Sequence, residues 1–376
     1  MKEFIAGKYI HQGYYKSFEP NSINKEWQIE NMELIQLLSK ADRQLGRLDM
    51  YSEYVNIDMF IQMHIAKEAT QSSKIEGTQT NIEEAFLSKK EIGSEKRDDW
   101  EEVQNYIIAM KEAVELLNDL PFSSRLIRQT HKVLLQGVRG EHKLPGEYRT
   151  SQNWIGGASI NDAVFVPPVY TSISDLISDL EKFANNQNNP LPDLIKAAII
   201  HYQFETIHPF LDGNGRVGRL LITLYFVSVG ILKSPILYLS DFFERHRSLY
   251  YDNLMRVRTH NDMEQWIKFF LTGIIETAQT GVMTFDKILQ LQKRLDVELK
   301  ELGTRSGDAF KVVEQLYQKP VINAQSVSKI IDKSMSTAYS LISELEKRQI
   351  LKEITGGERD RIYVFEEYIK LFKDEG

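Results

Sequence analysis

The feature that most restricts the fold of this chain is a loop-forming run set between two helical patterns. Residues 212–215 (Asp-Gly-Asn-Gly) do not suit the middle of a helix, because glycine and asparagine favour turns and left-handed backbone conformations. From residue 216 onward, leucines recur with helical spacing at Leu220, Leu221 and Leu224. The sequence therefore predicts a tight loop that leads directly into the first turn of a helix.

This loop and helix start combine residue types that suit phosphate chemistry. A helix N-terminus presents free backbone N–H groups and the positive end of the helix dipole. Arg216 and Arg219 lie three residues apart on one face of the first turn, and guanidinium groups bind phosphate oxygens well. Asp212 offers a hard oxygen ligand for Mg²⁺ on a polyphosphate, and His208 can titrate near neutrality. The segment is not a Walker A loop, because GxxxxGK(S/T) and its lysine are absent.

Composition excludes several other classes of site. The 376 residues carry a net charge of −7 and include no cysteine, which excludes disulfides, thiolate zinc sites and cysteine nucleophiles. The acidic balance disfavours bulk attraction to nucleic acid or anionic membranes. The sequence has no signal-peptide run at its start and no apolar run of the ~18–20 residues that span a bilayer. We expect a soluble, cytoplasmic protein of two or three domains that does not bind membranes.

Helical spacing of apolar residues covers most of the chain. It predicts helices over residues 23–48, 57–76, 98–118, 123–137, 172–186, 191–206, 214–230, 240–258 and 263–300. Residues 1–20 are expected to be irregular, and residues 80–83 (Thr-Asn-Ile-Glu) to form a capping box that opens another helix. Between residues 140 and 170, glycines and prolines flank two β-like runs at 152–155 and 164–166. These runs predict a hairpin on a helical body.

Residues 208–219 resemble the signature of the Fic family, HPFx(D/E)GNGRxxR, at every fixed position. The resemblance covers about residues 20–300 and implies a mainly α fold, with a Fic-type helical core and a β-hairpin flap. It implies transfer of AMP from Mg-ATP to a Tyr, Ser or Thr hydroxyl of a target protein, with release of pyrophosphate. The expected domains are an N-terminal helical region at 1–95, a Fic core at 96–302 and a C-terminal domain at 303–376.

The resemblance also implies a role for each signature position. His208 would be the general base that takes the proton of the target hydroxyl, and Asp212 would hold Mg²⁺. Arg216 would bind the β-phosphate and Arg219 the γ-phosphate, which aligns the α-phosphate for attack. Phe210 is expected to pack in the core and fix the loop. The residues expected around ATP are Gly213, Asn214, Gly215, Arg216, Val217, Gly218 and Arg219, with Tyr250 and Tyr251 near the adenosine.

A second short pattern resembles the inhibitory motif of the same family, (S/T)xxxE(G/N), at Ser72, Glu76 and Gly77. Ser72 and Glu76 lie four residues apart and share one face of a helix. The resemblance implies that Glu76 pairs with Arg219 and so takes the guanidinium that the γ-phosphate needs. ATP would still bind, but with its α-phosphate misaligned. The same glutamate could instead position a water molecule, so a de-AMPylating or bifunctional enzyme is the alternative.

The predicted flap carries Gln152, Trp154, Val164, Phe165 and Val166. An exposed hairpin edge can hold a target segment by strand addition. The flap would then set the hydroxyl of the target against His208. Self-modification and a homodimer are further expectations from the family resemblance.

Residues after 303 follow a different pattern. Helices over 308–318, 324–332 and 336–348, followed by β-like runs at 351–355 and 361–365, predict a winged helix-turn-helix with Arg359 and Arg361 on its wing. Residues 304–376 carry twelve basic and twelve acidic side chains, which gives little of the electrostatic term that dominates DNA affinity. DNA and protein are therefore both open as ligands. The non-enzymatic alternative for the whole chain is a nucleotide-sensing, DNA-binding regulator.

Overall fold

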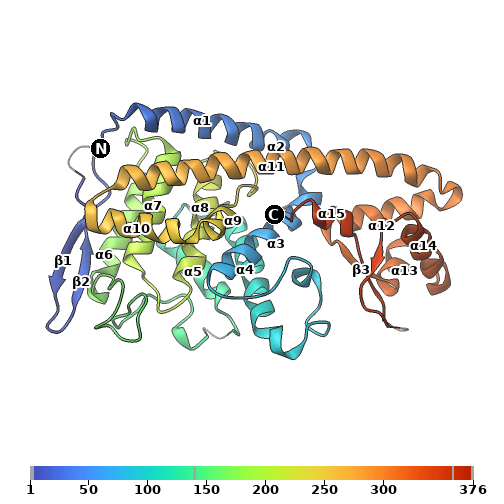
Figure 1. Ribbon diagram of the computed structural model, residues 1–376, viewed down its shortest axis with the longest axis horizontal. Helices are drawn as coiled ribbons and strands as arrows, with labels where there is room; N and C mark the ends of the chain where they lie inside the picture. Colours follow the sequence, from blue (N-terminus) through green and yellow to red (C-terminus); the bar gives the residue numbers. More distant parts are fainter. Residues whose placement is uncertain (1–3, 139–140, 358–359, 374–376) are drawn as a thin grey trace.

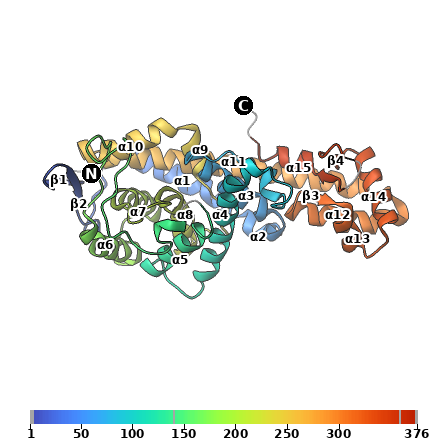
Figure 2. The same ribbon diagram turned by 90° about the horizontal axis from the view of Figure 1, so that it is seen from below.

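The computed structural model describes residues 4–138, 141–357 and 360–373, and it confirms the predicted mainly α fold. The longest helix, α11 (Met263–Lys300), runs along most of the molecule, with α1 (Met32–Asp49) beside it (Figure 1). At 1.5 Å per residue, the 38 residues of α11 extend about 57 Å. Most other helices gather against the first half of α11, and the C-terminal elements pack against its second half (Figure 2).

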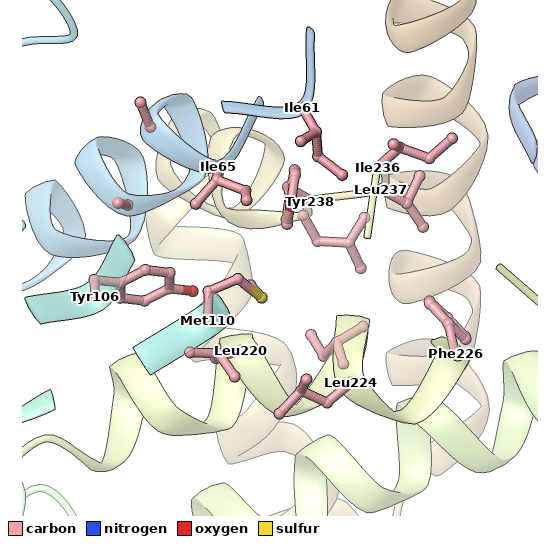
Figure 3. Packing of buried hydrophobic residues seen from close by; sticks show 14 of the residues in the cluster. Ile61, Ile65, Tyr106, Met110, Leu220, Leu224, Phe226, Ile236, Leu237 and Tyr238 are labelled. Atoms are coloured by element: carbon pink, nitrogen blue, oxygen red, sulfur yellow. The ribbon is translucent and has the colours of Figure 1, made fainter. Parts of the chain in front are cut away.

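Two helices that hold the predicted site lie at the centre of this group. In α7 (Asp193–Ile207) every residue from 194 onward is buried, and α8 (Asn214–Ser228) is buried over most of its length. A helix that is buried on all sides belongs to a core. Around α8 pack α3 (Ile57–Ile75), α4 (Arg97–Leu116) and α5 (Ser124–Leu134). Figure 3 shows side chains of these helices converging, among them Ile61 and Ile65 of α3, Tyr106 and Met110 of α4, and Leu220 and Leu224 of α8.

Shorter elements complete the helical body. They are α2 (Tyr51–Tyr54), α6 (Ile173–Asn185), α9 (Ser240–Arg245) and α10 (Arg247–His260), with 3₁₀ turns at Glu84–Phe86, Ser94–Lys96, Glu141–Lys143, Tyr170–Ser172 and Gly303–Arg305. The single helix predicted over 240–258 is wrong, because the chain breaks at His246 between α9 and α10. The predicted helix start at 23 is also wrong. Asn31 caps α1 by accepting from the N–H of Glu33, so the helix begins only at residue 32.

The predicted capping box lies one residue further along the chain. The side chain of Asn81 accepts from the N–H of Glu84 (2.8 Å), and the carboxylate of Glu84 accepts from the N–H of Asn81 (2.9 Å). Only one 3₁₀ turn follows, so the helix predicted after the capping box is absent from residues 84–93.

The first twenty residues are more regular than predicted. β1 (Gly7–His11) and β2 (Lys16–Pro20) form an antiparallel hairpin in which Tyr9 pairs with Phe18. The hairpin also touches the predicted flap, because the N–H of Phe18 donates to the carbonyl of Val166 at 2.9 Å.

The remaining elements, residues 306–357 and 360–373, are called the C-terminal module below. They are α12 (Ser306–Gln318), β3 (Val321–Asn323), α13 (Ala324–Ile331), α14 (Met335–Lys347), β4 (Lys352–Glu353), β5 (Ile362–Val364) and α15 (Glu366–Lys370). The three strands form an antiparallel sheet of order β3-β5-β4. The three helices α12, α13 and α14 and the strands β4 and β5 lie where the sequence predicted them, whereas β3 and α15 were not predicted. Arg361 donates to the carbonyl of Gly357, whereas Arg359 lies outside the described residues. Among the described residues, no helix is both long and apolar enough to cross a membrane.

Candidate active site

A cavity of about 730 Å³ brings together most of the residues that the sequence singled out. This volume suits a small-molecule ligand such as a nucleotide. The predicted residues that line it are Glu76, Gly77, Trp154, Val164, Phe165, His208, Asp212, Gly213, Asn214, Gly215, Arg216, Arg219, Tyr250 and Tyr251. Segments from the end of α3, the flap, the α7–α8 loop and α10 therefore meet at one place.

His208 ends α7 in the left-handed backbone region, with φ of +49°, which is uncommon for a residue with a side chain. The buried Arg149 holds this conformation, because its Nε donates to the carbonyl of His208 at 3.0 Å. Burial lowers the pKa of His208 to about 3, helped by the charges of Arg258 and Arg149, while Glu76 opposes the shift. The imidazole is therefore neutral at pH 7, which is the form that can accept a proton. The prediction that His208 titrates near neutrality is wrong for this arrangement, because its side chain is buried.

The loop after His208 is fixed from two sides. Phe210 is fully buried, as predicted, and its ring stacks on His131 with 3.6 Å between ring centroids. The Nδ1 of His131 accepts from the N–H of Gly146 (2.8 Å), so its Nε2 carries the proton and donates to the carbonyl of Asp212 (3.0 Å). The side chain of Asn214 accepts from the N–H of Phe210 and donates to its carbonyl. These contacts fix the loop that leads into α8, whose first residues line the cavity.

Arg216 lies between two carboxylates where the first turn of α8 lines the cavity. Its Nη1 lies 2.9 Å from Glu102 Oε2 of α4, and its Nη2 lies 4.0 Å from Asp212 Oδ1. Asp212 is half-exposed and accepts from the N–H of Gly213, whose φ of +74° suits glycine. One open carboxylate beside an anion-binding helix start fits Mg²⁺ that arrives on a polyphosphate, because this ion is usually held by one or two carboxylates and the phosphates themselves.

Arg219 is contacted by the end of α3. Its Nε donates to the hydroxyl of Ser72 (2.9 Å), and its Nη2 donates to the Ser72 carbonyl (2.9 Å) and to Glu76 Oε1 (2.7 Å). Burial alone would raise the pKa of Glu76, but the adjacent Arg219 lowers it below the ordinary value. A Cβ at Gly215 would overlap the Glu76 carboxylate, which therefore lies directly on the first turn of α8. Gly77, with φ of +106°, ends the helix just beyond it.

Five predicted site residues do not line the cavity. Ser72 is buried behind it and acts on Arg219 from there. Val217 and Gly218 are buried in the core, where Gly218 lies against Glu205 and its carbonyl contacts His201. Gln152 donates to the carbonyl of Pro167 (3.1 Å), and Val166 is buried under the N-terminal hairpin.

The predicted flap is only partly a hairpin. Its two runs meet at a single antiparallel bridge, between Ile155 and Phe165, rather than in a regular ladder. Trp154 and Val164 are exposed at the cavity, whereas Phe165 is buried, with the guanidinium of Arg258 3.8 Å from its ring centre. The carbonyl of Val166 already accepts from Phe18, so part of the strand edge is covered rather than open.

Several residues that line the cavity escaped the sequence prediction. They include Thr78, Glu102, Glu205, Leu254, Met255 and Arg258. Glu205 lies one turn before His208, and burial raises its pKa to about 7. Glu205 could have been predicted from its position three residues before His208, because residues at this spacing share one face of a helix. Of the two predicted tyrosines, Tyr251 is half-exposed at the cavity, and Tyr250 is buried with its hydroxyl 2.9 Å from His201 Nε2.

Comparison with known proteins matches this geometry to one family. Residues 35–115 match the model described as Fic/DOC family N-terminal, and residues 121–226 match the Fic/DOC family model. The chain is a Fic-domain protein. The second match includes the flap, the signature loop and most of α8, and the first includes the α3 segment that carries Ser72 and Glu76.

Curated relatives of this Fic-domain protein share modest identity with it. The protein adenylyltransferase Fic of Drosophila persimilis is 27% identical over 233 residues, which is 61% of this chain and 41% of that protein. The protein of the same name from Aedes aegypti is 34% identical over 125 residues, which is 33% of this chain and 22% of the relative. The chain therefore spans less than half of the length of these relatives.

Solved structures extend the likeness of fold. A Fic family protein from Desulfovibrio desulfuricans aligns with a TM-score of 0.58 and 17% identity, covering 91% of this chain and 98% of that one. Fic-1 of C. elegans aligns with a TM-score of 0.52 and 20% identity, and the alignment covers 68% of this chain and 75% of the Fic-1 chain. At these identities the likeness shows the fold, and the chemistry has to be argued from the site.

Proposed function

We propose that this Fic-domain protein transfers AMP from Mg-ATP to a hydroxyl side chain of a target protein. The observation that carries the proposal is one cavity lined by a neutral histidine, by the first residues of α8 and by Arg216 and Arg219 of that helix. The curated relatives are named protein adenylyltransferases, which supports the same reaction class. A phosphate site without such a base would suit binding alone, so His208 favours an enzyme over a nucleotide sensor.

Each group of residues in the cavity would have its own role in the reaction. His208 would take the proton of the target Tyr, Ser or Thr hydroxyl, while the hydroxyl oxygen attacks the α-phosphorus and pyrophosphate leaves. The N–H groups of residues 213–215 and the guanidinium of Arg216 would bind the α- and β-phosphates, and Arg219 would bind the γ-phosphate. Mg²⁺, held by Asp212 and the phosphates, would offset charge on the phosphate oxygens. The exposed Trp154 and Val164 of the flap would contact the target, and Tyr251 would lie near the nucleoside.

Glu76 would act as an internal inhibitor. Its carboxylate occupies Arg219 at 2.7 Å and lies on Gly215, which is where an anionic phosphate would have to bind. Nucleotide bound beside this contact would have its α-phosphate out of line with the attacking hydroxyl. Misalignment of the α-phosphate would slow the reaction strongly, because positioning supplies much of the rate in phosphoryl and nucleotidyl transfer.

A second reaction is favoured by one further observation. Glu76 and His208 line the same cavity, and each shifts the pKa of the other. A carboxylate in this place could hold a water molecule for removal of AMP from a modified target. The alternative function is therefore a de-AMPylating or bifunctional enzyme that uses the same residues.

The wider organisation is proposed on the same basis. We assign residues 1–95 to an N-terminal region with the inhibitory helix, 96–302 to the catalytic core and 303–376 to a winged-helix domain. DNA, a protein partner and a second copy of the chain remain candidate ligands, since the C-terminal domain carries no net charge. The composition without cysteine suits the reducing cytoplasm, where we place the protein.

The test uses ATP labelled at the α-phosphate with wild-type protein, Glu76→Gly and Glu76→Gly/His208→Ala. We expect label on protein, on a target in an added extract or on the chain itself, with Glu76→Gly and little with wild type. The double variant should transfer none. Equal labelling by the double variant would overturn the role of His208. AMP release from the labelled product by wild type alone would favour the second reaction.

A further inference from the structure

The helix that carries Glu76 is also the helix on which the C-terminal module rests. Phe60, on the first turn of α3, packs against Tyr317 of α12 with 5.2 Å between ring centroids. It also contacts Tyr368 of α15, and all three rings are buried. Figure 1 shows α12 and α15 on the side of the module that faces α3. The module therefore packs against the N-terminal end of α3 through an aromatic cluster.

A second contact lies nearer to the active site. His64, one turn after Phe60, is enclosed between Phe285 of α11 (4.7 Å) and Phe372, which follows α15 (4.9 Å). The next residue, Lys373, forms an ion pair with Glu83. Because Glu83 follows Glu76 in the chain, the module contacts this segment both before and after the inhibitory residue.

These contacts bear on the pairing of Glu76 with Arg219. His64 and Glu76 are twelve residues apart, about 18 Å along one helix at 1.5 Å per residue. A helix transmits a shift of one end to the other, and the 2.7 Å contact with Arg219 tolerates little displacement. Contacts that fix α3 at Phe60, His64 and Glu83 therefore favour the inhibited arrangement.

We infer that the C-terminal module is an autoinhibitory brace that holds α3 so that Glu76 stays on Arg219. The inference rests on the proposed inhibitory role of Glu76. Loosening the module from α3 would raise AMP transfer, and release of Glu76 would loosen the module in return, because coupling between two sites is reciprocal. A macromolecule that binds the module and weakens its hold on α3 would thus activate the enzyme.

The test removes the contacts nearest the chain end. Phe372→Ala/Lys373→Ala is compared with wild type, alone and in the Glu76→Gly background, by initial rates of label transfer from α-labelled ATP. We expect a rise of about 2- to 10-fold in the wild-type background, the scale of one aromatic contact, and no rise in the Glu76→Gly background. Tyr339→Ala is the matched control, because Tyr339 is a half-exposed aromatic residue of α14 in the same module, and it should change nothing.

Two results of the transfer assay would overturn the inference. One is an unchanged rate in the wild-type background, and the other is an equal rise in both backgrounds, which would mean that the module acts without Glu76. Circular dichroism confirms that the variants fold. Hydrogen exchange of the amides of residues 70–77 gives a readout independent of transfer, and it should speed up in Phe372→Ala/Lys373→Ala but not in Tyr339→Ala. If Glu76→Gly transfers no AMP, the proposed function fails, while unchanged exchange at 70–77 would separately refute the brace.

Discussion

Replacing Glu76 by glutamine and by alanine gives a graded test of its contact with Arg219. The contact joins a buried guanidinium to a carboxylate that is 37% exposed. A hydrogen bond to a charged group contributes about 1.5–3 kcal/mol, and the exposure of Glu76 places this one near the lower figure. Glu76→Ala should therefore raise the rate of AMP transfer about tenfold or more. Glutamine keeps an acceptor but loses the charge, which roughly halves the free energy of the hydrogen bond. Glu76→Gln should therefore raise the rate of AMP transfer about threefold.

The assay is the initial rate of label transfer at saturating Mg-ATP, with melting temperatures to confirm that each variant is folded. The order wild type, glutamine, alanine follows from the loss first of charge and then of the acceptor. A glutamine variant as active as the alanine variant would show that Glu76 acts by its shape rather than by its charge. No rise in either variant would refute the assignment of Glu76 as the inhibitor.

Three further predictions concern the core, the pH dependence of stability and the metal. Phe210→Ala should lower the free energy of unfolding by about 3–5 kcal/mol in denaturant titrations, because the ring is fully buried; a loss under about 1 kcal/mol would contradict this. Burial lowers the pKa of His64 from 6.5 to about 3, so its contribution to stability is complete above pH 6.5 and falls by about 2 kcal/mol at pH 5. Between pH 7 and 5, His64→Phe should lose about 2 kcal/mol less stability than the wild type. An unchanged pH dependence would count against the lowered pKa of His64. In the Glu76→Gly background, Asp212→Asn should raise the Mg²⁺ concentration needed for half-maximal transfer, and an unchanged requirement would exclude Asp212 as the ligand.

The parts of the site that could be predicted from the sequence are local. The glycines and asparagine of residues 213–215 cannot easily extend α7, so a loop followed by a helix start was the simplest arrangement. The pairing of Glu76 with Arg219 was different, because it joins residues 143 positions apart. It came from the family resemblance and not from spacing, and the structure brings the two side chains together.

Other features depend on packing that the sequence does not display. The hairpin β1–β2 escaped prediction because each strand has only five residues, which is too short for a clear alternation of buried and exposed positions. The break at His246 has no glycine or proline to mark it. Glu102 and Arg258 reach the cavity from α4 and α10, and no signature links them to His208.

The contact between α3 and the C-terminal module was equally hidden. Phe60 and His64 lie in an ordinary helical pattern, and their aromatic partners follow more than 200 residues later. Only the folded chain shows that α3 and the module share one interface.

Transfer of the AMP part of ATP, rather than its terminal phosphate, is distinguished by following the two ends of the nucleotide separately. Glu76→Gly is incubated with ATP labelled either at the α-phosphate or at the γ-phosphate, and protein-bound label is counted. We expect label on protein from the α-position only, and none when His208→Ala is added to the variant. Label from the γ-position would mean phosphorylation rather than AMP transfer, and would overturn the proposed function.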